Sequence, residues 1–189
     1  LSKKDTPSNV KIFQLPNMEE HSASKSFYRA DAVQIKWDSR GTAVLIQTST
    51  EVDKTNQSYY GETGLYLLFA DGSFQCTVSK GDSGPIQDCQ WSPSGRNFIV
   101  VQGTQPAQAT LYKAEHCTPQ FEFGKGSRNT IRWSPHGRFV CLGGFGNLAG
   151  EMQFWDLNKL KLLGTCQEID SAKSFEWAAD SRCFVTATL

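Results

Sequence analysis

Short apolar runs separated by turn residues recur along the chain, and four of them share one arrangement around a tryptophan. They read VQIKWDSRGTAVLI, QDCQWSPSGRNFIV, NTIRWSPHGRFVCL and KSFEWAADSRCFVT, centred on Trp37, Trp91, Trp133 and Trp177. An apolar or thiol side chain stands two residues before each tryptophan, and a polar one stands directly before it. This alternation is typical of a strand with one buried face. The four segments therefore predict four equivalent strands.

A tight turn is expected after each tryptophan. Pro93 and Pro135 preset the backbone angle at the second turn position, and glycines such as Gly95 and Gly137 can take a positive φ four residues after the tryptophan. An apolar run follows each turn at once, so each repeat predicts a β-hairpin. The fourth copy has Ser181 where the others have glycine, which makes its turn the least well specified.

The repeat has the length of a propeller blade. The tryptophans are separated by 54, 42 and 44 residues, and two further strand-like runs follow each of the first three hairpins, such as AQATLYKA and PQFEFG after Trp91. A period of about 40 to 45 residues with four strands predicts an all-β, WD40-like β-propeller. Only one Trp-Asp dipeptide occurs, Trp155-Asp156, so the propeller is divergent. An ordinary β-sandwich is the alternative.

The ends of the chain predict incomplete blades. VKIFQLP and SFYRA have the pattern of the two outer strands of a blade, and the chain stops after the two inner strands of another. We expect a partial propeller with three complete blades and two half blades: half blade 8–30, blades 31–80, 84–124 and 128–167, and half blade 172–189. Either the halves pair and close a four-bladed ring, or the chain belongs to a longer propeller whose open edges favour self-association.

Charge and cysteine content limit the possible partners. Nineteen Lys and Arg balance nineteen Asp and Glu among 189 residues, so any attraction to nucleic acid must be local. The start of the chain lacks the apolar run of a signal peptide, and no stretch is long and apolar enough to span a membrane. These features predict a soluble, intracellular protein.

The six cysteines are scattered without a CxxC pair, which favours reduced thiols in the core over disulfides or metal ligands.

The chain offers no recognisable chemistry. His21, His116 and His136 are expected in loops or turns, away from any catalytic motif. The stretch GGFGNLAG is one residue too long for a dinucleotide loop and leads into a strand rather than a helix. The polar run from Asp53 to Glu62 has Ser58 at the sixth position, where an EF-hand loop requires glycine. We expect no enzyme activity, no cofactor and no metal.

Five motifs together point to one family. FYRAD, VDKTNQSYYGE, FEFGKGSRN, SPHGR and GGFGNLAGEMQFWDL, in this order, resemble the propeller of eukaryotic translation initiation factor 2A from about residue 10 to the end. The resemblance implies a cytoplasmic, non-catalytic factor that acts with the small ribosomal subunit, initiator methionyl-tRNA and other initiation proteins. It also implies a nine-bladed propeller followed by a less ordered region implicated in binding tRNA and mRNA. The alternatives are the propeller found in initiation factor 3 and a general WD-type protein scaffold without a nucleic-acid role.

One segment is locally basic. FGKGSRNTIRWSPHGRFV, residues 123–140, contains Lys125, Arg128, Arg132 and Arg138 and no carboxylate. Such a segment can contact RNA phosphates or a ribosomal partner. The alternative is that these are solvated loop charges.

A second candidate lies in the first repeat, whose extra length falls within residues 50–66. Loops on a rigid scaffold often hold function, and this one ends near Tyr59 and Tyr60. The two tyrosines could stack on bases or anchor a partner, or one of them could cover the edge of its own blade.

Overall fold

The computed structural model describes residues 7–28, 30–50, 61–79, 83–148, 151–167 and 174–187. Within these ranges the protein is all-β and contains no helix long and apolar enough to cross a membrane. The strands are β1 (Ser8–Phe13), β2 (His21–Phe27), β3 (Ala32–Trp37), β4 (Ala43–Ser49), β5 (Thr63–Phe69), β6 (Gln75–Ser79), β7 (Ile86–Trp91), β8 (Asn97–Gln102), β9 (Ala107–Lys113), β10 (Thr118–Gly126), β11 (Thr130–Trp133), β12 (Phe139–Gly143), β13 (Glu151–Asp156), β14 (Lys161–Gln167), β15 (Ser174–Trp177) and β16 (Phe184–Ala187).

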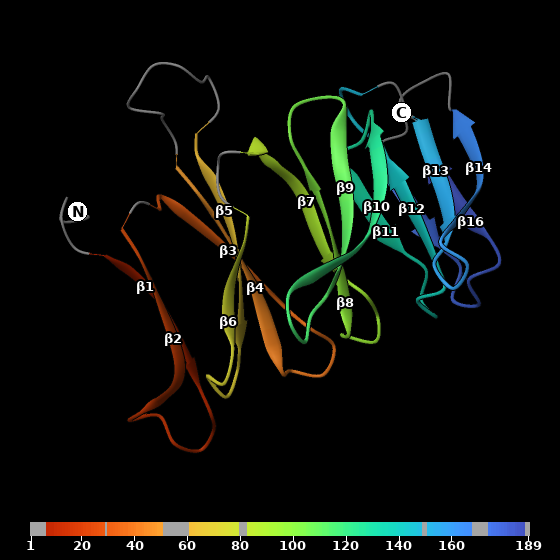
Figure 1. The fold of residues 1–189 in the computed structure, drawn as a ribbon. Helices are drawn as coiled ribbons and strands as arrows, with labels where there is room; N and C mark the ends of the chain where they lie inside the picture. The colour runs from red at the N-terminus through yellow and green to blue at the C-terminus, as the bar shows by residue number, and fades with distance from the viewer. Residues whose placement is uncertain are drawn as a thin grey trace. The chain divides into compact units, whose positions relative to one another are not determined.

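The strands form five antiparallel sheets in which each strand pairs with its neighbour in sequence (Figure 1). β3–β6, β7–β10 and β11–β14 are four-stranded, while β1–β2 and β15–β16 are two-stranded. This arrangement confirms the predicted fold class, a partial β-propeller with three complete blades and two half blades. The chain divides into two compact units, Leu1–Pro85 and Ile86–Leu189, called unit 1 and unit 2.

Unit 1 is built from the β1–β2 hairpin and the β3–β6 sheet. Its core cluster joins apolar side chains of β1 and β2 to those of β4 and β5, and its buried members are Ile12, Ala23, Phe27, Val44, Ile46 and Leu68. The Ser22 hydroxyl adds a polar link by donating to the carbonyls of Ile12 and Ala70 at 3.2 and 2.6 Å. Apolar packing and this hydroxyl together hold the hairpin on the sheet.

Unit 2 contains two core clusters, one on each side of the β11–β14 sheet. One joins this sheet to β7–β10 through Ile99, Val101, Ala107, Ala109, Leu111, Phe123, Ile131, Val140 and Leu142. The other joins it to β15–β16 through Cys141, Phe145, Met152 and Phe175. Apolar residues therefore lie on both faces of β12, since Val140 and Leu142 face one neighbour and Cys141 faces the other. Burial raises the pKa of the Cys141 thiol to about 12.

The predicted hairpin turns form with one repeated hydrogen-bond pattern. The turn after each tryptophan is closed by an amide four residues beyond it, as in Gly95 N to Ser92 O at 2.9 Å and Gly137 N to Ser134 O at 2.8 Å. Ser181 makes the same bond to Ala178 O at 2.9 Å and adopts the same positive φ, 62°. The fourth turn therefore forms without glycine.

Three expectations drawn from the sequence were wrong or incomplete. His21 begins strand β2 rather than lying in a loop. The residue two positions before the tryptophan is buried at Cys89, Ile131 and Phe175, but Ile35 is 49% exposed and belongs to no side-chain cluster in the core of unit 1. Among the cysteines, all of which lie in the described ranges without a disulfide, Cys183 is exposed rather than buried.

Candidate nucleic-acid interface

In unit 2 the hairpin turns gather at one end of the sheets. Because the strands are antiparallel, the turns that join β7 to β8, β9 to β10, β11 to β12, β13 to β14 and β15 to β16 all lie at this end, which we call the turn end. Neighbouring turns touch. A Cβ placed on Gly137 would lie 3.4 Å from Pro93 Cδ, and the His136 amide donates to Ser181 Oγ at 3.2 Å. The turn end is therefore a continuous surface shared by successive blades.

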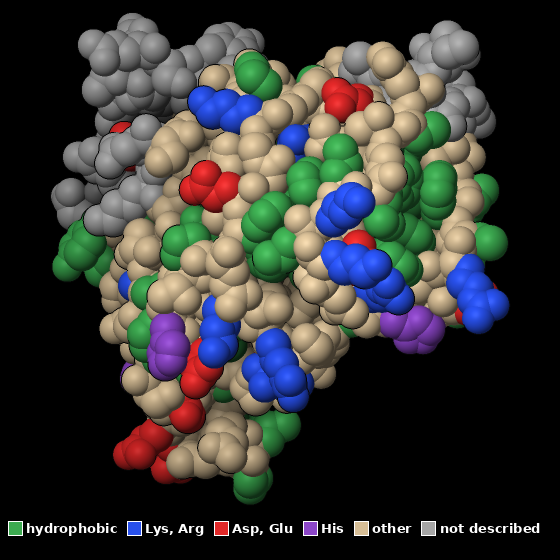
Figure 2. All heavy atoms as spheres, turned by 45° about the vertical axis from the view of Figure 1, so that its right-hand side comes forward, with side chains coloured by type: hydrophobic (Ala, Val, Ile, Leu, Met, Phe, Trp, Pro, Cys, Tyr) green, Lys and Arg blue, Asp and Glu red, His purple; other side chains and the backbone are tan. Residues whose placement is uncertain are grey.

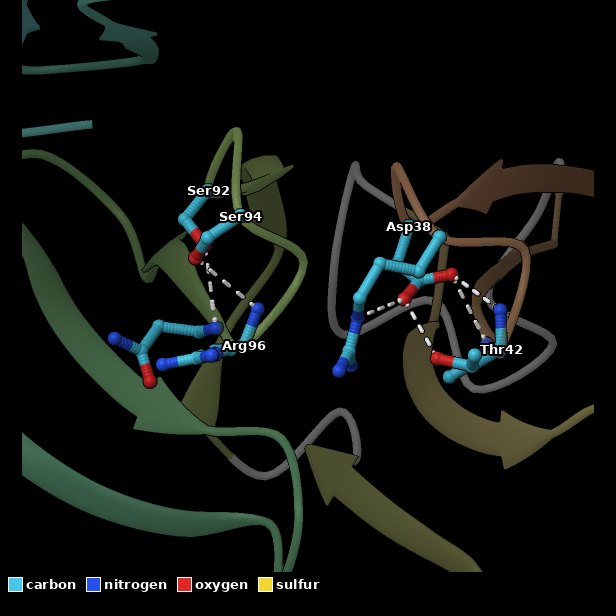
Figure 3. A network of polar contacts seen from close by, with 8 residues as sticks. Asp38, Thr42, Ser92, Ser94 and Arg96 are labelled. Carbon is cyan, nitrogen blue, oxygen red and sulfur yellow. Dashed lines mark hydrogen bonds and ion pairs between the residues drawn. The ribbon is translucent and has the colours of Figure 1, made fainter. Parts of the chain in front are cut away.

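The residue after each of the first three tryptophans caps its turn. In unit 2 the hydroxyl oxygen of Ser92 accepts from Asn97 N at 3.2 Å, and that of Ser134 accepts from Phe139 N at 3.0 Å. Figure 3 shows the cap of Ser92, whose hydroxyl also lies 3.1 Å from that of Ser94. The caps hold the backbone of the turns, and with it the side chains that the turns present.

Unit 1 uses a carboxylate for the same purpose (Figure 3). Asp38 Oδ1 accepts from the amides of Thr42 and Ala43 at 2.7 and 3.1 Å, and Oδ2 accepts from the Thr42 hydroxyl at 2.7 Å. Burial of Asp38 favours its neutral form, but these hydrogen bonds, together with one from Arg40, outweigh burial and lower the pKa of the carboxyl. The ionised Asp38 is thus part of the folded turn.

Three arginines occupy equivalent positions at the turn end. Arg96, Arg138 and Arg182 each stand five residues after a tryptophan, and all three are exposed. Within the part of the chain that the structure describes, Arg96 and Arg182 form no ion pair. The sequence analysis did not group these three arginines, because it considered one continuous basic segment. The feature that they share is an equivalent position in successive blades.

Arg138 differs because it is held by a buried carboxylate. Its Nη2 and Nε donate to Asp156 Oδ2 at 2.8 and 3.2 Å, and the Asp156 side chain is only 2% exposed. The pairing raises the pKa of Arg138 and lowers that of Asp156. One end of the guanidinium is therefore used within the blade, while the side chain remains about half exposed.

The structure corrects the prediction for Arg128, which is buried and only 2% exposed. Its Nη2 donates to Gln153 Oε1 at 3.2 Å, and its backbone amide and carbonyl pair with the side chain of Gln105 at 3.1 and 2.8 Å. Burial lowers the pKa of the guanidinium, and the nearby charge of Glu151 partly offsets that effect. Arg128 therefore links Gln105 of one blade to Gln153 of the next, and its buried side chain is not available to a partner.

The remaining predicted contact residues do not form one cluster. Lys125 is exposed near the end of β10, and Arg132 is exposed on β11 with Nη1 donating to the Ile131 carbonyl at 3.2 Å. Arg138 lies beyond the other end of β11, at the turn end. Tyr59 and Tyr60 lie outside the described residues. The basic run in the sequence is thus divided between the two ends of the sheet, because a strand separates its members.

A hollow of about 400 Å³ lies at the turn end between the β7–β10 and β11–β14 sheets. Its lining combines an indole and aliphatic side chains with hydroxyl and amide groups: Ser92, Ser94, Asn97, Leu111, Gln120, Trp133, Gly137, Leu157, Asn158 and Leu160. The indole is fixed, because Trp133 Nε1 donates to the Gln90 carbonyl at 3.3 Å. The hollow therefore offers a rigid mixed surface next to the turn arginines.

Charge on the face that Figure 2 shows is divided into small groups. In the space-filling view, Lys and Arg side chains occur singly or in small clusters among polar and hydrophobic side chains rather than as one continuous patch (Figure 2). The described residues also contain no group of three or more His, Cys, Asp or Glu side chains that could hold a metal ion. A contact with phosphates on this face would therefore use such small clusters.

Comparison with known proteins identifies the family. The family model described as "Eukaryotic translation initiation factor eIF2A" matches residues 25–189. The chain belongs to the family of eukaryotic translation initiation factor 2A. Members of this family from Dictyostelium discoideum and Drosophila melanogaster are 43% and 38% identical to it, over 99% and 98% of the chain. The chain spans 30% and 29% of the length of these two relatives.

More distant comparisons agree with this family and with the fold. A component of eukaryotic translation initiation factor 3 from Bombyx mori is 25% identical over 97% of the chain, which makes the initiation factor 3 alternative the weaker one. A solved structure titled "Crystal structure of the eukaryotic initiation factor" superposes with a TM-score of 0.83 at 29% identity. The match covers 98% of this chain and 43% of that one. The chain is therefore similar to a segment of a longer β-propeller initiation factor.

Proposed function

We propose that this chain is part of the rigid, non-catalytic propeller scaffold of a cytoplasmic translation initiation factor that acts with the small ribosomal subunit and initiator methionyl-tRNA. The observation that supports this proposal most directly is the match to the factor 2A family over residues 25–189. The chain spans only part of the length of its relatives. We therefore assign to it a surface that partners can contact, and not the activity of the whole factor. Scaffolds of packed blades suit this role, since their loops are held in fixed positions.

The turn end of unit 2 is the surface that we assign to contact with ribosomal RNA. Arg96 and Arg182 are exposed and form no ion pair among the described residues, and between them lies the half-exposed Arg138. Guanidinium groups are well suited to phosphates because they donate in a planar fork. Lys125, near the end of β10 away from the turns, and Arg132, on β11, are the other exposed candidates.

The experiment measures binding of the full-length protein to purified small ribosomal subunits at several salt concentrations. The test variant is Arg96→Glu with Arg182→Glu, and a second variant combines Lys125→Glu with Arg132→Glu. Arg138 is left unchanged, because a carboxylate beside the buried Asp156 would disturb the fold. Lys11→Glu, on the exposed part of β1, is the control for a charge reversal away from both candidate positions.

We expect wild-type protein and the Lys11→Glu control to bind alike, and the Arg96→Glu, Arg182→Glu variant to bind more weakly with a shallower salt dependence. A loss confined to the Lys125→Glu, Arg132→Glu variant would move the contact to these two residues. If no form of the protein binds small subunits even at low salt, the proposed function is wrong.

A further inference from the structure

The hollow at the turn end has hydrogen-bonding groups that the protein itself does not use. Asn97, Gln120 and Asn158 are among its lining residues, and their side-chain amides make no hydrogen bond within the described residues. The backbone amides of Asn97 and Asn158, in contrast, are fixed by bonds to Ser92 Oγ at 3.2 Å and Asp156 Oδ1 at 3.0 Å. These positions are thus held in place while their side chains remain available to a ligand.

The apolar part of the hollow is equally well fixed. Trp133 is half-buried and tied to Gln90, and Leu111 is only 4% exposed. Leu157 and Leu160 complete this side, with Leu160 41% exposed. The hollow therefore offers an apolar side and hydrogen-bonding groups to the same ligand.

The charges beside the hollow indicate what such a ligand is attached to. Arg96 directly precedes the lining residue Asn97, and Arg138 directly follows the lining residue Gly137. Two guanidinium groups thus stand on turns that form the wall of the hollow: Arg96 forms no ion pair among the described residues, and Arg138 is half exposed with one edge paired to Asp156. Their charge is complementary to a phosphate chain that passes over the opening.

We infer that this hollow takes one unstacked base of single-stranded RNA, with the adjoining phosphates on Arg96 and Arg138. The base lies against Trp133 and the leucines, and its edge bonds to the amides of Asn97, Gln120 and Asn158. Proteins that bind unpaired RNA combine aromatic stacking, amide contacts and basic residues in this way. The inference rests on the proposed function, to which it adds that the recognised RNA is single-stranded.

A peptide side chain is the competing occupant of a hollow of this size. The lining favours RNA, because three amides that make no hydrogen bond with the described part of the protein and two adjacent arginines match a base edge and its phosphates better than an apolar anchor. The experiments below distinguish the two occupants.

The first experiment measures binding of a fluorescein-labelled oligouridylate of roughly ten nucleotides to the full-length protein by anisotropy. Asn97→Leu with Gln120→Leu removes the amides at similar volume and leaves the arginines in place. Gln167→Leu, an exposed amide at the far end of β14, is the matched control. Inorganic polyphosphate, which has the charge but no bases, is the competing probe.

We expect the Asn97→Leu, Gln120→Leu variant to bind the oligonucleotide roughly tenfold more weakly, with unchanged binding of polyphosphate and an unchanged salt slope. Arg96→Gln should weaken binding to both polymers and reduce the salt slope by about 0.7. Equal binding of the oligonucleotide by the amide variant and by wild type would overturn the inference. An equal loss of polyphosphate binding in the amide variant would also overturn the inference, because the substitutions would then affect binding of charge and not of a base.

The second experiment places a photo-crosslinking residue at Leu160 of the full-length protein bound to small ribosomal subunits. A crosslink to ribosomal RNA supports the inference, while a crosslink only to ribosomal protein overturns it in favour of a peptide. The two proposals fail separately. If subunit binding is absent but the oligonucleotide results hold, the proposed function is wrong and the base site stands. If subunits bind normally and the oligonucleotide results do not hold, only the base site is wrong.

Discussion

The indole of Trp133 donates to the carbonyl of Gln90, 43 residues earlier, at 3.3 Å. The same bond recurs one blade later, where Trp177 Nε1 donates to the Arg132 carbonyl at 3.0 Å. In both pairs the acceptor is the residue just before the tryptophan of the preceding blade. In unit 2 the tryptophan therefore ties β11–β14 to β7–β10 and β15–β16 to β11–β14, in addition to the apolar packing that it provides.

Replacing Trp133 by Phe should destabilise the protein, because it removes this bond while keeping most of the apolar surface. We expect a loss of about 1 kcal/mol, measured as a lower midpoint of urea unfolding. Trp155→Phe is the control, since the Trp155 indole also packs against aromatic rings but its N–H donates only within its own strand, to Gln153 Oε1 at 3.4 Å. An equal or larger effect of the control would contradict the role given to the bond between blades.

Ser181 offers a test of the fourth turn. Its φ of 62° is unfavourable for a residue with a Cβ, yet its hydroxyl accepts from the His136 amide at 3.2 Å. Ser181→Ala keeps the strain and loses the bond, while Ser181→Gly loses the bond and relieves the strain. We therefore expect the alanine variant to melt at a lower temperature than the glycine variant. The reverse order in a thermal unfolding experiment would show that the backbone angle is not strained.

Arg128 is expected to matter for packing and not for binding. Its guanidinium is buried, and Nη1 has no hydrogen-bond partner within the described residues. A methionine fills similar space without a buried charge, so Arg128→Met should leave the thermal stability unchanged or raise it. Arg128→Ala should lower stability by about 2 kcal/mol or more, because it leaves a cavity.

The control for this prediction is binding of small ribosomal subunits, which should be the same for Arg128→Met and wild type. Specific weakening by the methionine variant, with its stability intact, would restore Arg128 as a contact residue.

Acid should weaken the turns through Asp38 and Asp156. The pKa of each carboxyl is lower in the folded protein than its ordinary value, so the folded state binds fewer protons than the unfolded state near that pH. The stabilisation is present above the unfolded pKa of about 3.9 and is lost as the pH falls through the lower folded pKa. The melting temperature should therefore decline below about pH 4.

Asp38→Asn tests the share of one carboxylate in this pH dependence. The variant should be less stable at pH 7, since the amide cannot accept all the bonds that the carboxylate accepts, and its stability should change less between pH 5 and pH 3. An identical decline in the variant and in wild type would assign the acid sensitivity to other groups.

The sequence by itself determined the fold class of this protein. The alternation around Trp37, Trp91, Trp133 and Trp177 and the turn after each of them are local features, fixed by side-chain direction in a strand and by backbone angles. Their repetition at blade length was sufficient to predict four-stranded sheets. The family also followed from linear motifs, which the family model over residues 25–189 confirms.

Only the tertiary structure decided which charged residues are exposed. Arg128 and Arg138 are ten residues apart in one basic run, yet one is buried between blades and the other reaches the surface at the turn end. Exposure depends on what the neighbouring blade places against each side chain, such as Gln105 and Gln153 around Arg128. The hollow beside Trp133 likewise requires two blades, because residues more than sixty positions apart form its walls. Local sequence patterns cannot predict such contacts, because the contacts form only when the sheets pack against each other.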